Sequence, residues 1–238
     1  MLVAAAVCPC PPLLVPQVAA GAAPELDAAR AACADAIGVL AAARPDRLVV
    51  VGSTGSAGTE SYPEGTPGSF RGFGVDLAVR LGRGDGPDDG RELPASLAVA
   101  AWLLERSSGW PDVPVEGIGV GDALGTERCL DTGRDVAAGA GRVAALVMGD
   151  GSACRTLKAP GYLDERAAPF DAQIARALGA ADVTALAALD PVLARELQAG
   201  GRAPWQVLAG AAEGARLGGA LLYEDAPYGV GYFVAAWS

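Results

Sequence analysis

Histidine is missing from all 238 residues of this chain. Without an imidazole the chain cannot form a Ser-His-Asp triad, a Cys-His dyad, a zinc site with histidine ligands or a two-histidine, one-carboxylate iron site. Lysine is nearly absent as well, because Lys158 is the only one and every other basic residue is arginine. Any chemistry must therefore use carboxylates, thiols, hydroxyls, guanidinium groups or this single amine.

Positive charge is also scarce, since 18 basic residues face 28 acidic ones and the net charge is −10. Nucleic acids and anionic membranes bind to basic surfaces, so we expect neither as a partner. No segment reaches the roughly 18 consecutive apolar residues that a membrane helix needs. The first residues, MLVAAAV, lack the basic start and the length of a signal peptide. These features together predict a cytoplasmic protein.

The cysteines are few, odd in number and scattered along the chain: Cys8, Cys10, Cys33, Cys129 and Cys154. A disulfide framework would need an even number of cysteines at closer spacing, so the pattern does not predict one.

What the chain has in quantity is apolar material, which makes up 51% of the residues and is enough for a substantial core. Unbroken apolar runs alternate with helical patterns, and this alternation predicts a single α/β domain over 1–238. We expect a mainly parallel or mixed central sheet with helices on both faces. The expected strands are 1–7, 47–52, 115–120 and 142–149, a strand or hairpin at 70–81, and two apolar runs about a turn at 226–227. The expected helices are 24–43, 94–107 and 126–139, and residues 161–214 are expected to be helical and broken at Pro169, Pro191 and Pro204.

Unusual loops follow three of the predicted strands. Ligand sites in open α/β sheets form at the carboxyl ends of strands, so these loops mark the candidate site. A final turn close to the C-terminus can approach the same edge. The four segments are 8–12, 52–55, 149–155 and 223–229.

The same segments carry a resemblance to a known family. In order, they read CPCPPLL, RPDRLVVVGST, MGDGSACRTLKAPGYLDERAAPFD and YEDAPYGVGYF. This order resembles an actinobacterial branch of the class III extradiol ring-cleavage dioxygenase superfamily, which includes protocatechuate-type enzymes, DOPA-type dioxygenases and MEMO proteins. The resemblance implies an α/β fold with a central sheet. In active members it also implies Fe(II) held by two histidines and a third ligand, with a further histidine as acid and base.

Carried onto this chain, the catalytic pattern of the family is incomplete. Cys10 and Thr54 stand where the resemblance places the two metal-binding histidines, and Arg155 stands at the place of the acid/base histidine. The nearest acidic candidates for the third ligand are Glu224 and Asp225. Threonine is a poor iron ligand, and arginine neither binds a cation nor gives up its proton in proteins. We therefore predict a divergent protein that is not a conventional Fe(II) catechol dioxygenase.

Three functions remain open from the residues. The first is a cleft that binds a small aromatic or anionic molecule, lined by Cys10, Thr54, Ser152, Cys154 and Tyr228, with Arg155 beside them. The second is an oxidoreductase or hydrolase with a rebuilt centre, in which thiolates and a carboxylate bind zinc or copper, or a thiol acts as nucleophile. Its candidate residues are Cys10, Cys154 and Glu224. The third is a non-catalytic interaction or assembly protein of the MEMO type.

Purely structural roles are open for the same residues. Free cysteines are often simply small buried residues, and a Cys10–Cys154 disulfide is also open. Arg155 either binds an anionic ligand or forms an ion pair with Asp150 or Asp164. Lys158 is interpreted as a lone exposed amine. We expect the chain to form a homo-oligomer, because members of the superfamily commonly do.

Overall fold

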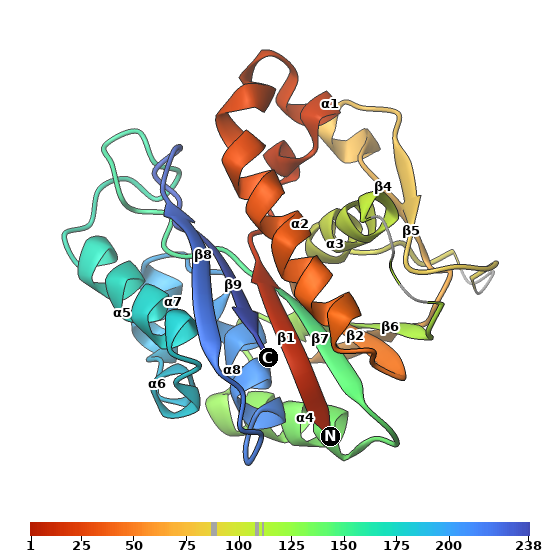
Figure 1. The fold of residues 1–238 in the computed structure, drawn as a ribbon. Coiled ribbons are helices and arrows are strands. Elements are labelled where there is room, and N and C mark those ends of the chain that lie inside the picture. The colour runs from red at the N-terminus through yellow and green to blue at the C-terminus, as the bar shows by residue number, and fades with distance from the viewer. Residues whose placement is uncertain (87–89, 108–109, 111) are drawn as a thin grey trace.

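The computed structural model describes residues 1–86, 90–107, 110 and 112–238, and its centre is a seven-stranded mixed sheet (Figure 1). The strand order is β3-β6-β2-β7-β1-β9-β8. The four inner strands β6, β2, β7 and β1 are parallel, whereas β3, β9 and β8 join antiparallel at the two sides. The bounds are β1 Leu2–Cys8, β2 Arg47–Thr54, β3 Thr59–Tyr62, β6 Val115–Gly121, β7 Val143–Met148, β8 Gly219–Asp225 and β9 Tyr232–Trp237.

Alternate residues of the inner strands enter two separate cores. Along β1, Ala4 and Ala6 belong to one buried cluster, and Ala5 and Val7 belong to the other. This alternation follows from the two-residue period of a strand. Because both faces are covered, β1 and β7 are apolar along their whole length, as their sequences predicted.

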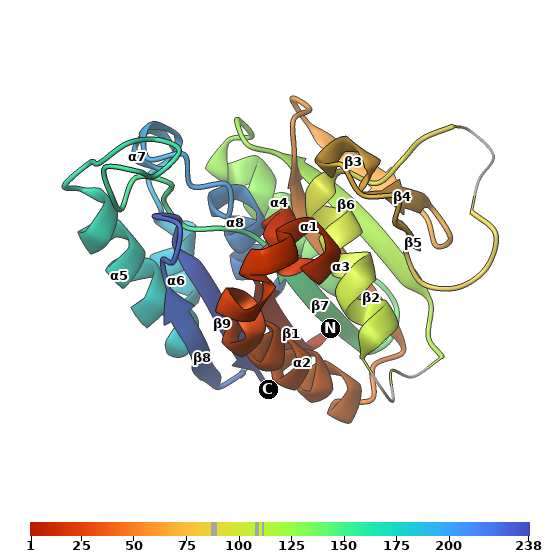
Figure 2. The same cartoon turned by 90° about the horizontal axis from the view of Figure 1, so that it is seen from above.

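Helices cover both faces of the sheet (Figure 2). On one face α2 packs on β1 and β9, and α3 packs on β2; on the other, α8 packs on β2 and β7 while α5 packs on β8. The α-helices are α1 Pro16–Ala19, α2 Asp27–Ala42, α3 Ala95–Arg106, α4 Thr126–Ala138, α5 Ala167–Gly179, α6 Val183–Ala187, α7 Pro191–Glu196 and α8 Arg202–Ala211. Short 3₁₀ turns occupy η1 Pro12–Leu14, η2 Ala20–Leu26 and η3 Arg71–Phe73.

The approach of α4 to α8 depends on two glycines. A Cβ atom at Gly133 would collide with the carbonyl oxygen of Val207, and one at Gly210 would collide with that of Leu130. The two backbones therefore lie closer than any side chain would allow.

The observed architecture confirms the expected α/β fold with a mixed sheet between helical layers. Three details differ. Residues 59–62, which are not among the expected strands, form the edge strand β3. Residues 70–81 contribute only β5 Ala78–Arg80, which pairs with β4 Pro67–Ser69 in a separate small sheet. Residues 161–166 are a loop rather than a helix, and of the three prolines only Pro191 stands at a break, as the first residue of α7; Pro169 and Pro204 lie in the first turns of α5 and α8. A proline is tolerated there because the first N–H groups of a helix have no partner inside it.

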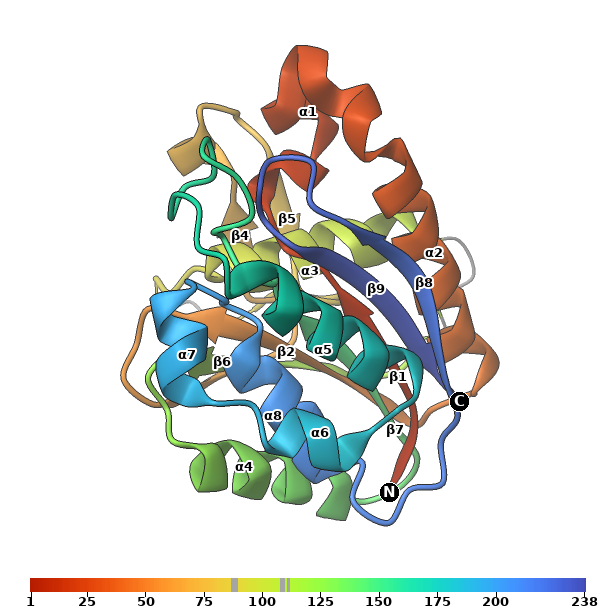
Figure 3. The same ribbon diagram turned by 90° about the vertical axis from the view of Figure 1, so that its left-hand side faces the viewer.

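The carboxyl ends of the parallel strands meet at one edge of the sheet, at the top of Figure 1, and the N-terminus lies at the opposite edge. The loop over 150–166 lies beside the turn between β8 and β9 there (Figure 3). Backbone hydrogen bonds join the two, including Arg155 N–H to the Gly229 carbonyl at 3.0 Å. Among the described residues, no helix has both the length and the apolarity to span a bilayer.

Candidate functional site at the carboxyl edge of the sheet

Two acidic residues directly follow parallel strands at this edge. Asp150 follows β7, and its Oδ1 accepts a hydrogen bond of 2.8 Å from the backbone N–H of Cys10, in the loop after β1. Asp122 follows β6, close enough to Cys10 to influence its ionisation. Tyr232 lies at the start of β9, and the charges of Asp150 and Cys10 both raise the pKa of its hydroxyl. The edge thus gathers two carboxyl groups, a thiol and a phenol, which we call the strand-end cluster.

Every group of the strand-end cluster is shifted towards its neutral form. Burial raises the pKa of Asp150 from 3.8 to about 7, against the hydrogen bond from Cys10. Burial also raises the pKa of the Cys10 thiol, and the charges of Asp150 and Asp122 raise it further. Desolvation is likewise the main cause of the raised pKa values of Tyr232, which is buried, and of Asp122, whose residue is exposed and whose carboxyl is only partly desolvated. Near neutral pH, Asp150 can therefore both donate and accept a proton, whereas the Cys10 thiolate is disfavoured.

Arg155 forms its ion pair with Asp171, a partner that the sequence did not suggest. The Asp171 carboxylate on α5 is fully buried, and its Oδ2 accepts a hydrogen bond of 3.0 Å from Arg155 Nη1. The same carboxylate accepts hydrogen bonds from the backbone N–H and from the hydroxyl of Ser152, both of 2.8 Å. Burial raises the Asp171 pKa, although these hydrogen bonds and the Arg155 charge oppose the shift. Ser152 is therefore a buried anchor of the loop rather than a free cleft residue.

The proposed cysteine centre is not brought together. Cys10 packs with the core on the α2 and α3 face, whereas Cys154 is buried in the core on the opposite face and lies 3.5 Å from the Leu197 carbonyl oxygen. Glu224 is an exposed residue of the edge strand β8. All five cysteines are free, and no group of three Cys, Asp or Glu residues suited to a metal occurs in the described part of the chain.

Two further predicted residues lie at this edge without a specific polar contact. Thr54 is half-buried at the end of β2, paired in register with Gly121 of β6. Tyr228 is half-buried in the turn between β8 and β9, and its hydroxyl makes no hydrogen bond within the described chain. Burial and the neighbouring Glu25 raise the Tyr228 pKa.

Two cavities open at this edge. One, of about 700 Å³, lies between the 150–166 loop and the β8–β9 turn; its lining is Arg155, Thr156, Leu157, Lys158, Leu163, Pro227 and Tyr228, and we call it the loop groove. The other, of about 310 Å³, is lined by Asp122 and by the ends of α7 and α8. Both volumes are in the range that holds a small molecule.

The residues present do not fit the Fe(II) that the resemblance implies. By that resemblance Cys10, Thr54 and Arg155 would stand at the three histidine places, and the structure holds Arg155 in an ion pair with a buried carboxylate. A guanidinium neither ligates a metal nor accepts a proton, and a threonine hydroxyl is a weak iron ligand. These three side chains therefore do not form an iron site.

Sequence reasoning missed the acidic members of the site. Asp150 and Asp122 each stand immediately after a predicted strand, and that position is the signal that could have identified them. Asp171 could not be found in this way, since it lies within a helix far along the chain. Lys158 was placed correctly as exposed, but its position on the wall of a cavity was not foreseen.

Comparisons with known proteins give the fold alone. No protein-family model matches the chain, and no curated protein matches it in sequence. The chain is similar in structure to the crystal structure of an uncharacterized protein from Escherichia coli K12, with a TM-score of 0.57 and 14% sequence identity over 99% of each chain. The likeness covers the full length and carries no statement about activity.

Proposed function

We propose that this protein is a divergent relative of the class III extradiol dioxygenases that binds a small aromatic or anionic molecule at the carboxyl edge of its sheet. In this proposal the protein does not carry out Fe(II)-dependent ring cleavage. The observation that carries it is the state of Arg155, which replaces the acid/base histidine and is anchored to the buried Asp171.

The edge nevertheless keeps features of a ligand site. Two cavities open there, and the Asp150 carboxyl has a pKa of about 7, so it can offer either a hydrogen-bond donor or an acceptor to a ligand. The alternative enzyme built on cysteine has less support, because Cys154 lies apart from Cys10 and the Cys10 thiolate is disfavoured. Zinc or copper binding through these thiols is accordingly not part of the proposal.

A thermal-shift experiment with and without added Fe(II) tests this function. Catechol and protocatechuate, which adds a carboxylate to the same ring, are compared at equal concentrations. We expect protocatechuate to raise the melting temperature equally in the presence and absence of Fe(II), with no yellow ring-cleavage product. A stabilisation that requires Fe(II), or oxygen uptake above that of free iron, would contradict the proposal.

Self-association remains a prediction. The strand β8 forms an open edge of the sheet and exposes Leu222, a feature that favours pairing with a second copy. Light scattering after gel filtration tests it, and a monomer at micromolar concentration would contradict it.

A further inference from the structure

The loop groove unites the only lysine of the chain with exposed apolar side chains. Leu157 is 61% exposed and Leu163 is 44% exposed, and both line the groove together with Pro227. Large apolar side chains are normally covered, and an exposed group of them beside a cavity marks a binding surface. Tyr162, between them in sequence, is 63% exposed as well.

The shape of the groove is fixed by the backbone. Arg155 N–H bonds to the Gly229 carbonyl at 3.0 Å, Gly161 N–H to the Ala153 carbonyl at 2.9 Å, and Asp164 N–H to the Cys154 carbonyl at 3.0 Å. These bonds tie the loop to itself and to the β8–β9 turn. The leucines are therefore exposed on a preformed surface, which lowers the entropy lost when a ligand binds.

The charge of the groove is positive although the chain carries a net charge of −10. Lys158 is exposed and makes no ion pair with any described residue. Arg155 uses Nη1 to bond Asp171 and leaves its side chain 29% exposed, with N–H donors remaining on Nε and Nη2. Asp171 balances Arg155, and Glu25 lies beside the Tyr228 hydroxyl at the rim, so Lys158 is the lining cation that no described carboxylate pairs with.

We propose that the loop groove binds an amphipathic monoanion, with its acidic group at Lys158 and Arg155 and its apolar body on Leu157, Leu163 and Pro227. This inference rests on the proposed function and names the class of ligand for that edge of the sheet. The unpaired Lys158 amine can bind one carboxylate or sulfonate, and Arg155 donates in the fixed geometry that such groups accept. The apolar wall requires an aromatic or alkyl body, so inorganic anions alone bind weakly.

Two fluorescent probes that share one aromatic body test the inference. The first is 8-anilinonaphthalene-1-sulfonate, a monoanion, and the second is N-phenyl-1-naphthylamine, which lacks the sulfonate. We expect the monoanion to bind with a saturable stoichiometry of one per chain and more tightly than the neutral probe. Lys158→Gln should weaken the monoanion about fivefold, or about 1 kcal/mol, and leave the neutral probe unchanged.

Two further variants locate the site. Arg176→Gln removes another exposed cation, in the last turn of α5 and outside both cavities of this edge, and should not change binding of either probe. The double variant Leu157→Ser, Leu163→Ser should weaken both probes, since it removes the apolar wall. Both positions are exposed, so we expect the fold to persist, and circular dichroism checks this.

Several results would overturn the inference. Among them are equal effects of Lys158→Gln and Arg176→Gln, equal affinity of the two probes for the unmodified protein, and the absence of saturable binding. If protocatechuate still stabilises the protein without iron in any of these cases, the proposed function stands and only the assignment of the groove fails. If that stabilisation is also missing, both fail.

Discussion

Asp150 makes a measurable prediction about stability. Its pKa is about 7 in the folded chain against 3.8 for an ordinary aspartate, because the folded chain buries the carboxyl group. Between these two pH values the folded chain keeps a proton that the unfolded chain releases, so the free energy of unfolding falls as the pH rises. The full difference corresponds to about 4 kcal/mol, reached above pH 7, and this figure is an upper bound because Asp150 is only half-buried.

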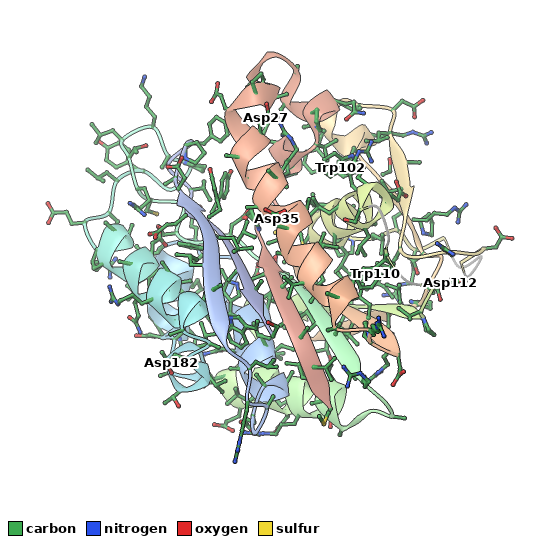
Figure 4. The ribbon with its side chains drawn as sticks, viewed as in Figure 1. Asp27, Asp35, Trp102, Trp110, Asp112 and Asp182 are labelled. Atoms are coloured by element: carbon green, nitrogen blue, oxygen red, sulfur yellow. The ribbon has the colours of Figure 1, made fainter. Side chains whose placement is uncertain are left out.

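Asp150→Asn removes the ionisation and keeps an oxygen that can accept the Cys10 N–H. We expect the variant to match the unmodified protein near pH 4 and to be more stable by up to about 4 kcal/mol at pH 8. Urea unfolding at a series of pH values measures this difference. Asp35→Asn, an exposed position on α2 (Figure 4), serves as the control and should give a flat difference. A difference for Asp150→Asn that does not change between pH 4 and pH 8 would refute the assigned burial of this carboxyl.

Three further predictions concern the loop and the helices. Arg155→Gln leaves the buried Asp171 carboxylate without its counter-ion and should destabilise the protein by about 1–3 kcal/mol at pH 7. The loss should be smaller near pH 4, where the carboxyl takes up a proton. Equal losses at both pH values in urea unfolding would argue against the ion pair. Gly133→Ala should destabilise the protein by about 3 kcal/mol or more, because its Cβ meets the α8 backbone. Gly38→Ala in α2, where the new Cβ has no neighbour within 4 Å, should be neutral or stabilising by up to about 1 kcal/mol. Thermal unfolding of both variants measures the difference, and equal melting temperatures would contradict the close contact of α4 with α8. Asp182→Ala (Figure 4) removes the side chain that caps α6 by accepting Ala185 N–H at 2.9 Å and should cost about 1 kcal/mol, and a melting temperature equal to that of the unmodified protein would contradict the cap.

The sequence was a good guide to the layers of the fold because apolar runs and helical periods are local signals. The inner strands, α2, α3 and α4 lie within a few residues of their predicted places. The strand β3 was missed because TESY is short and polar, and its pairing with β6 depends on the tertiary structure. The prolines of α5 and α8 were misjudged because a proline can lie in the first turn of a helix as well as interrupt one.

The candidate site was predictable in place but not in its contacts. The loops after β1, β2 and β7 do meet at one edge, as the topology of parallel strands requires. Which partner Arg155 takes was not predictable, since Asp171 lies 16 residues away on a helix and both flanking aspartates were equally plausible from the sequence. The separation of Cys10 from Cys154 also depends on which face of the sheet each loop enters, and no local pattern encodes that choice.

The proposed relationship to the extradiol dioxygenases implies that this fold keeps the place of their iron site without side chains that can hold iron. Cys10 follows β1 and Thr54 is the last residue of β2, the two strands that flank β7, and Asp150 follows β7 itself. The double variant Cys10→His, Thr54→His would therefore place two imidazoles on either side of a carboxylate, the set that non-haem iron prefers.

Anaerobic titration of Fe(II) into the unmodified protein and this double variant is the most direct test. The account predicts no stoichiometric binding by the unmodified protein and one iron per chain in the double variant, lost again when Asp150→Asn is added. Tight binding of one Fe(II) by the unmodified protein would contradict the claim that its side chains cannot hold iron. No gain in the double variant would contradict the claim that the place of the site survives.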